Sequence, residues 1–228
     1  MQIGEKENFL NLFYLFLTVK FYNIKEEIHV FFRYYCQKKF FFLDIFLKFF
    51  YLFKNPYRIC KDFLKKRGGK DIYLYGETPL TTMEKIAKKG EITSSDVVFE
   101  LGAGRGRSSF WLSHFIGCKV IAIEWVPFFA YVANRVIKIF REKKMHFFLQ
   151  DIFETKFDEA TVIYLYGTCL KDEEIQNLLR KFEKLKKNTK IISISYSLSD
   201  YSTNFSYQKK WDVSFPWGDT QAYLCTRK

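Results

Sequence analysis

The chain of 228 residues is long enough for one α/β domain and a smaller extension. Its net charge of +12 is uneven: residues 1–70 hold 14 Lys/Arg against 6 Asp/Glu, and residues 71–228 hold 23 against 19. This distribution argues against a uniformly basic surface that follows nucleic acid. The five cysteines are scattered and the three histidines show no metal-ligand spacing, so we expect reduced thiols, a cytoplasmic compartment and no metal site.

Residues 9–53 are dominated by aromatic and aliphatic side chains. The runs 9–19 and 40–53 are both shorter than the roughly 20 apolar residues that a membrane-spanning helix needs. The start of the chain is not basic and no small-residue cleavage site follows, so a secretory signal is not expected. Polar residues at helical spacing in and after the second run predict a helix with one narrow polar stripe, made of Gln37, Asp44, Lys48, Tyr51 and Asn55.

A polybasic segment follows, with seven basic residues and one acid between Lys54 and Lys70. Two interpretations stay open. Residues 9–70 could make a peripheral membrane contact, with apolar side chains in the interface and lysines on anionic headgroups. Alternatively, they form a helical cap that packs on the rest of the chain. Gly68-Gly69 reads as a linker, so we expect a hydrophobic and basic helical extension at 1–70 and a second domain at 71–228.

From residue 71 onward, short apolar runs alternate with helix-like stretches. This alternation predicts an α/β fold with a Rossmann-like, doubly wound, mostly parallel seven-stranded sheet. The run at 221–227 has no helix before it, so we expect it to be antiparallel. The runs expected as strands are 96–101, 119–125, 146–151, 160–166, 190–197 and 221–227.

The turn after the first of these strands is rich in glycine. Gly102, Gly104 and Gly106 follow Glu100 and allow the backbone to turn tightly and approach a ligand. The GxGxG spacing differs from that of dinucleotide folds and P-loops. An acid at the start of the loop would repel a pyrophosphate but tolerate a cation.

Two further acids end successive strands of the predicted sheet. Glu124 ends the second strand, where a ribose diol needs an acceptor. Asp151 ends the third strand, where it could accept the amino group of an adenine. Three features at neighbouring strand ends together predict a nucleoside-like ligand, which an ordinary glycine turn alone would not.

These features resemble those of class I S-adenosylmethionine (SAM) methyltransferases, whose first motif is ExGxGxG. The segment YGET at Tyr75–Thr78 is similar to one that closes over the cofactor in the non-SET histone-lysine methyltransferases of the disruptor-of-telomeric-silencing family. The same order of motifs continues to about Thr226. The resemblance implies SAM as cofactor, bound by Tyr75, Thr78, Glu100, Gly102, Gly104, Gly106, Glu124 and Asp151.

The end of the fourth strand departs from that family. It reads YLYGTCL, with Tyr166 and Gly167, where the family has a paired-asparagine motif. This ending, the N-terminal hydrophobic part and the LGxGxGR loop are more similar to the membrane-anchored mitochondrial protein-lysine methyltransferases. The two resemblances together favour a protein lysine as the methyl acceptor.

Methyl transfer to a lysine requires a neutral amine, which a desolvated aromatic channel favours. Tyr166, Trp217 and Tyr223 are the candidates for that channel, each with ordinary packing as the alternative. Glu77 is a candidate for shaping the cofactor pocket or stabilising the acceptor, or it caps a helix that starts near Thr81. A small molecule, a lipid, RNA or DNA stays open as the acceptor, although the [DNS]PP[YFW] motif of amino-methylating nucleic-acid enzymes is absent. A non-enzymatic scaffold stays open as well.

Overall fold

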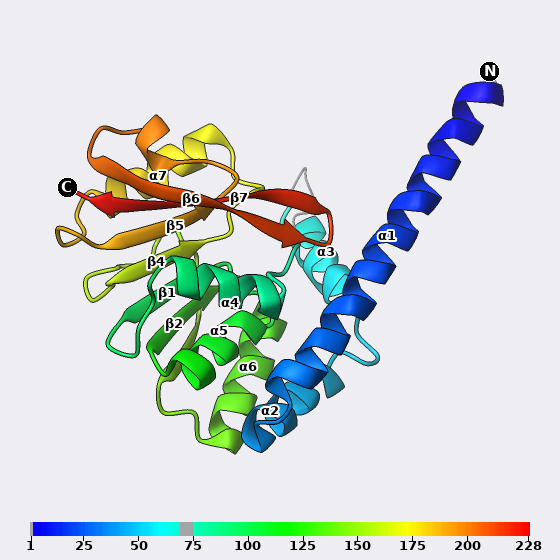
Figure 1. Ribbon diagram of the computed structural model, residues 1–228, viewed down its shortest axis with the longest axis horizontal. Helices are drawn as coiled ribbons and strands as arrows, with labels where there is room; N and C mark the ends of the chain where they lie inside the picture. Colours follow the sequence, from blue (N-terminus) through cyan, green and yellow to red (C-terminus); the bar gives the residue numbers. More distant parts are fainter. Residues whose placement is uncertain (1, 69–74) are drawn as a thin grey trace.

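The computed structural model describes residues 2–68 and 75–228, including side chains from Asn11 onward except that of residue 12 (Figure 1). Helices and strands alternate after an all-helical N-terminal part. Their bounds in chain order are α1 Gln2–Tyr34, α2 Lys38–Phe49, α3 Pro56–Lys66, α4 Leu80–Lys89, β1 Val97–Leu101, α5 Arg107–Trp111, the π-helical turn η1 Leu112–Ile116, β2 Lys119–Glu124, α6 Pro127–Phe140, β3 Met145–Leu149, β4 Val162–Leu165, α7 Asp172–Phe182, β5 Lys190–Ile194, the 3₁₀ turn η2 Leu198–Asp200, β6 Phe205–Phe215 and β7 Gly218–Arg227.

The strands form one seven-stranded sheet in the order β3-β2-β1-β4-β5-β7-β6. Strands β1 to β5 are parallel, whereas β7 pairs antiparallel with β5 and β6 antiparallel with β7. The predicted fold class and the antiparallel last strand are therefore confirmed. Strand β6 was not among the predicted runs, although its buried and exposed residues alternate toward its C-terminal end as expected for a strand with one face on the core.

Helices cover both faces of the sheet (Figure 1). Because successive strand residues point to opposite faces, Val98 of β1 packs in the core under α4, α5 and α6, while Phe99 packs in the core under α7. Helix α7 has three acids in its first turn and Arg180 and Lys181 in its last, which suits the helix dipole. The Glu174 carboxylate accepts a hydrogen bond from the Lys171 backbone N–H at 2.8 Å and fixes the start of the helix.

The N-terminal helices share a core with the sheet. Val30 of α1 and Phe40, Leu43 and Leu47 of α2 are fully buried in the same cluster as Val98. In Figure 1 the C-terminal half of α1 packs on the body of the protein and its N-terminal half projects away from it. None of the helices in the described part of the chain combines the length and the apolar character needed to cross a membrane.

A buried ion cluster joins α2 to the glycine loop. Asp44 is 1% exposed, and its two oxygens accept hydrogen bonds from Arg107 Nε at 2.8 Å and Arg107 Nη2 at 2.9 Å. Glu27 of α1 contacts the same guanidinium at 2.9 Å, and Lys48 contacts both acids. The arginine holds the pKa of Asp44 far below its usual range. Of the predicted polar stripe, Asp44 and Lys48 lie within α2, and Asp44 points into the protein.

Removing this carboxylate should destabilise the fold. Asp44→Ala leaves the buried Arg107 without its bidentate partner, and we expect a loss of about 3 kcal/mol in the free energy of unfolding in urea. Arg58→Ala breaks an exposed pair with Asp62 at 3.9 Å and should cost under about 1 kcal/mol. Equal losses in the two variants would contradict the assigned role of the cluster.

Candidate active site

Two adjoining hollows lie at the carboxyl ends of β1 and β4, where ligands bind in parallel α/β sheets. They share Gly76, Leu101, Gly102 and Tyr166. The first, which we call the polar pocket, is lined by those four residues and by Glu77, Thr78, Glu100, Ala103, Arg107 and Ser108. The second, which we call the apolar cavity, has a volume of about 170 Å³ and is lined by the shared Gly76, Leu101, Gly102 and Tyr166 together with Cys60, Phe63, Leu64, Tyr75, Gly104, Glu124, Trp125, Val126, Ile152, Leu165, Gly167, Cys169 and Leu170.

The glycine loop borders both hollows, and all three glycines have positive φ. A Cβ on Gly102 would meet no atom within 4 Å, so this glycine keeps open space above the loop. A Cβ on Gly106 would lie 2.8 Å from the Phe147 ring, so this glycine is required by packing. Gly102 therefore borders the place where a ligand fits.

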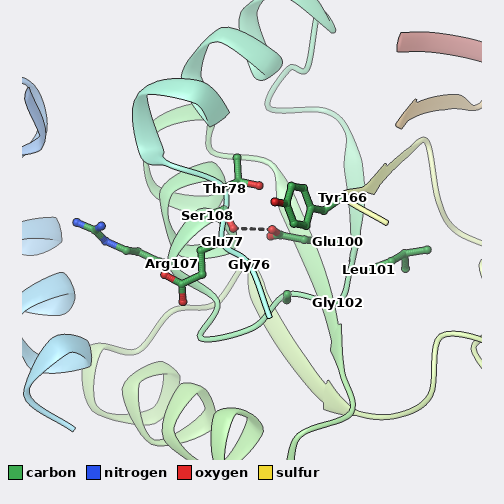
Figure 2. A pocket seen from close by; sticks show the side chains of 10 residues that line it. Gly76, Glu77, Thr78, Glu100, Leu101, Gly102, Arg107, Ser108 and Tyr166 are labelled. Carbon is green, nitrogen blue, oxygen red and sulfur yellow. Dashed lines mark hydrogen bonds between the residues drawn. The ribbon is translucent and has the colours of Figure 1, made fainter. Parts of the chain in front are cut away.

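Glu100 lies at the floor of the polar pocket (Figure 2) and is 4% exposed. Ser108 Oγ donates a hydrogen bond to one carboxylate oxygen at 2.5 Å, and Ser109 Oγ donates to the other. Burial raises the pKa of Glu100 to about 7, and the nearby Glu77 and Glu124 act in the same direction. Figure 2 shows Arg107 pointing away from Glu100, toward the N-terminal helices.

Glu124 is held entirely by backbone groups. One oxygen accepts a hydrogen bond from the Gly104 N–H at 2.7 Å, and the other accepts from the Trp125 and Val126 N–H groups at 2.9 and 2.7 Å. Burial raises its pKa to about 7 despite these bonds. In the part of the chain that the structure describes, neither Glu100 nor Glu124 forms an ion pair with a Lys or Arg.

The YGET segment crosses the mouth of the polar pocket. Glu77 forms a bidentate ion pair with Arg105 of the glycine loop and also accepts a hydrogen bond from the Tyr75 hydroxyl. Arg105 lowers the pKa of Glu77. Because both of its oxygens are occupied, the geometry favours pocket shaping over acceptor stabilisation for Glu77. The Thr78 hydroxyl bonds to the Tyr164 hydroxyl at 2.6 Å.

The predicted aromatic channel is assembled in part. Trp217 lies in the turn between β6 and β7, and its Nε1 donates a hydrogen bond to the Tyr166 hydroxyl at 2.6 Å. The Phe215 ring stacks on Trp217 and lies 5.2 Å from the Tyr166 ring. A Cβ on Gly76 would lie 3.0 Å from the Tyr166 ring, so the glycine of YGET makes room for it.

Four predicted residues line neither hollow: Gly106 and Trp217, described above, and also Tyr223 and Asp151. Tyr223 sits within β7, where its hydroxyl bonds to Gln221, so it does not join Tyr166 and Trp217. Asp151 accepts a hydrogen bond from the Phe153 N–H, and its neighbour Ile152 lines the apolar cavity instead. The role of Asp151 in binding an adenine stays a prediction.

One wall of the apolar cavity comes from α3. Its Cys60, Phe63 and Leu64 line the cavity, and Phe63 packs edge-on against Trp125. The sequence pattern of this segment was interpreted through its charge, and these residues were not predicted as part of the site. Their spacing of three and four residues is typical of one apolar helix face and could have revealed them.

Residues 64–213 match the family described as "Histone methylation protein DOT1". The chain belongs to the DOT1 family. A curated relative is the "Histone-lysine N-methyltransferase, H3 lysine-79 specific" of Dictyostelium discoideum, which is 23% identical over 155 residues. That alignment covers 61% of this chain and 8% of the relative.

Solved structures agree on the fold. An RNA methyltransferase from Salinibacter ruber, in complex with S-adenosyl-L-homocysteine, has a TM-score of 0.55 and 25% identity, covering 66% of this chain and 92% of that one. Geranyl diphosphate C-methyltransferase from Streptomyces coelicolor has a TM-score of 0.53 and 12% identity, covering 64% and 78%. The DOT1-family chain thus has the fold of class I SAM-dependent methyltransferases.

The raised pKa of Glu100 predicts a specific pH dependence of stability. Between pH 4.5 and 7 the unfolded chain releases this proton while the folded protein keeps it, so the contribution of Glu100 to stability falls as pH rises to about 7. Glu100→Gln removes this loss. Its free energy of unfolding relative to the wild type should therefore rise by about 1–3 kcal/mol from pH 5 to pH 8. The exposed Glu154→Gln is the matched control, and a parallel rise in that variant would contradict this origin.

Proposed function

We propose that this DOT1-family chain transfers a methyl group from SAM to a lysine side chain of a protein, with histones as the substrate class. The carrying observation is the pair of buried acids, Glu100 and Glu124, beside the open space at Gly102. A buried carboxylate without a cationic partner is costly, and a ligand that supplies a cation or hydroxyl donors relieves that cost. The Dictyostelium relative supports the protein-lysine assignment.

The residues present fit this cofactor. Glu100 in the polar pocket would accept the cationic amino-acid end of SAM. Glu124 would accept hydrogen bonds from the ribose hydroxyls of SAM. The apolar cavity between Phe63, Trp125 and Leu170 suits a flat base. Bound there, SAM supplies a methyl group on a positively charged sulfur.

The chain's own residues prepare the acceptor. Tyr166, Trp217 and Phe215 form an aromatic wall next to the polar pocket. Such a wall excludes water and lowers the pKa of an inserted lysine, which favours the neutral amine that attacks. Glu77 positions the YGET segment through Arg105, and alignment of amine and methyl then provides the rate enhancement.

The test uses the full chain with tritiated SAM, offered separately to core histones and to a lysate of the source cells that is then divided into protein, RNA and lipid. We expect the wild type to label a histone lysine, and we expect the Gly104→Val variant to give no such label. A Cβ on Gly104 would press on the Tyr75 ring at 3.3 Å and toward the cavity. Gly117→Val carries the same positive-φ strain away from both hollows and should keep SAM binding. Label only in RNA, lipid or a small molecule would overturn the protein-lysine assignment.

A membrane contact within residues 9–70 is a second proposal, carried by one surface. Phe49 at the end of α2 and Leu52 and Phe53 in the link to α3 are exposed, and Phe53 is 92% exposed. The basic helix α3 follows directly, with Lys65 and Lys66 in its last turn. Apolar side chains beside basic ones suit an anionic lipid surface.

Co-sedimentation with anionic vesicles tests this surface. We expect Phe53→Ser to reduce vesicle binding by about tenfold, since one buried aromatic side chain contributes about 1.5 kcal/mol or more. The matched control is Tyr131→Ser, an exposed aromatic on α6. Binding that is absent in the wild type, or unchanged in Phe53→Ser, would refute the proposal.

A further inference from the structure

The first turn of α3 places an exposed aromatic ring beside the candidate active site. Tyr57 is 56% exposed, although its ring packs edge-on against Tyr75 of the YGET segment with ring centroids 5.1 Å apart. The helix face that carries Tyr57 continues through Cys60 and Leu64, three and seven residues later, and these two side chains line the apolar cavity. Tyr57 therefore lies at the rim of the site, one helical turn before the wall that α3 contributes to the cavity.

The backbone at the start of α3 is fixed by local contacts. Asn55 is the N-cap of the helix, and its Oδ1 accepts a hydrogen bond from the Tyr57 N–H at 2.9 Å. Pro56 follows at the first helical position, where its fixed φ suits the helix and its missing N–H leaves no donor unpaired. These two residues hold the backbone of Tyr57 in place and leave its ring available for another contact.

The Tyr57 hydroxyl lies close to charged and polar groups of the site. Burial raises the pKa of Tyr57, Glu77 acts in the same direction and Arg105 opposes it. Burial also raises the pKa of Tyr166, and Tyr57 adds to that rise. Because such couplings weaken with distance, Tyr57 and Tyr166 belong to one neighbourhood. Glu77 and Arg105 form an ion pair with each other, so the pair adds no net charge to this rim.

A second exposed ring lies near Tyr166. Trp217 in the β6–β7 turn is 47% exposed, and its Nε1 donates a hydrogen bond to the Tyr166 hydroxyl at 2.6 Å. The Phe215 ring stacks on Trp217 and supports it from below. Figure 1 shows α3 and the β6–β7 turn at the same end of the sheet. Two exposed rings from widely separated parts of the chain are therefore brought near one tyrosine at the mouth of the site.

A pair of exposed rings suits a cation that is carried on an apolar stem. The faces of Tyr and Trp rings attract an ammonium group, and the stem of a lysine packs on the same apolar surface. We propose that Tyr57 and Trp217 form the entrance through which the acceptor lysine reaches Tyr166, with Tyr57 as a specificity-determining residue for the acceptor.

This inference rests on the proposed function, since it concerns the acceptor of that reaction. Tyr57 precedes residues 64–213, the part of the chain that matches the DOT1 family. The entrance is therefore built jointly by the family domain, through Trp217, and by the N-terminal helices, through Tyr57. The N-terminal part of the chain then takes part in acceptor binding as well as in the hydrophobic core.

Steady-state kinetics of the full chain test the role of Tyr57, with tritiated SAM and either core histones or the lysate protein that the wild type labels. Tyr57→Leu keeps an apolar contact with Tyr75 and removes the ring face. We expect it to raise the KM for the protein acceptor about fivefold, since an ammonium on an exposed ring contributes about 1 kcal/mol. Its kcat and its dissociation constant for SAM should stay within about twofold of the wild type.

Two matched variants are the controls. Tyr57→Phe keeps the ring and should keep the KM for the acceptor within about twofold of the wild type. Tyr131→Leu removes a tyrosine of similar exposure on α6 that lines neither hollow, and it should leave the KM for the acceptor unchanged. Circular dichroism confirms that each variant is folded.

The outcomes separate this inference from the proposed function. If the wild type labels a protein and Tyr57→Leu keeps the wild-type KM for it, the inference is overturned and the proposed function stands. A weaker affinity for SAM in Tyr57→Leu would show that Tyr57 acts through Tyr75 on the cofactor, and an equal loss in Tyr57→Phe would exclude the ring face as the contact. Either result would overturn the inference. A wild type that labels no protein would overturn both.

A double variant tests whether the two rings contact the same side chain. If Tyr57 and Trp217 both pack on one lysine, the effects of Tyr57→Leu and Trp217→Leu on the KM for the acceptor should not multiply in the combined variant. Effects that multiply would indicate two independent contacts and would contradict a shared entrance.

Discussion

The ion pair between Arg107 and Asp44 is the contact on which the arrangement of the site depends. Arg107 is the first residue of α5, directly after the glycine loop, and Asp44 belongs to α2. Arg105, two residues before Arg107, forms a similar bidentate ion pair with Glu77. The two arginines of one loop therefore hold the N-terminal helices on one side and the YGET segment on the other. Since both guanidiniums are used inside the protein, neither is free to bind a phosphate, and this agrees with a ligand that carries positive charge.

Glu100 and Glu124 are buried without a Lys or Arg partner in the described part of the chain. Glu100 and Glu124 are satisfied by hydroxyl and backbone donors, which hold a carboxylate in place without neutralising it. Their pKa values near 7 reflect a site whose electrostatics are incomplete in the protein alone. Such acids destabilise the folded protein at neutral pH, and a bound cation or hydroxyl donor would relieve this cost.

The residues that the sequence assigns to cofactor binding come from local signals, and most of them line the two hollows. Each of these signals can be recognised within a few neighbouring residues: the glycines, the strand ends and the YGET segment. The contacts that were missed join distant parts of the chain: Asp44 and Arg107 are 63 residues apart. A lone acid in an apolar run has the pattern of a surface stripe, and only the packed fold reveals its buried partner. For Tyr223 the strand was predicted correctly, but the direction of a side chain relative to the site depends on register, which the pattern did not fix.

Trp217 in the β6–β7 turn lies on a different part of the sheet from the strands that end at the two hollows. The two hollows lie at the carboxyl ends of parallel strands in the middle of the sheet. Trp217, by contrast, sits on a hairpin at the sheet edge and reaches the site only through Tyr166 and Phe215. A substitution in this turn can therefore alter the aromatic contact with Tyr166 while the buried acids Glu100 and Glu124 keep their hydrogen bonds.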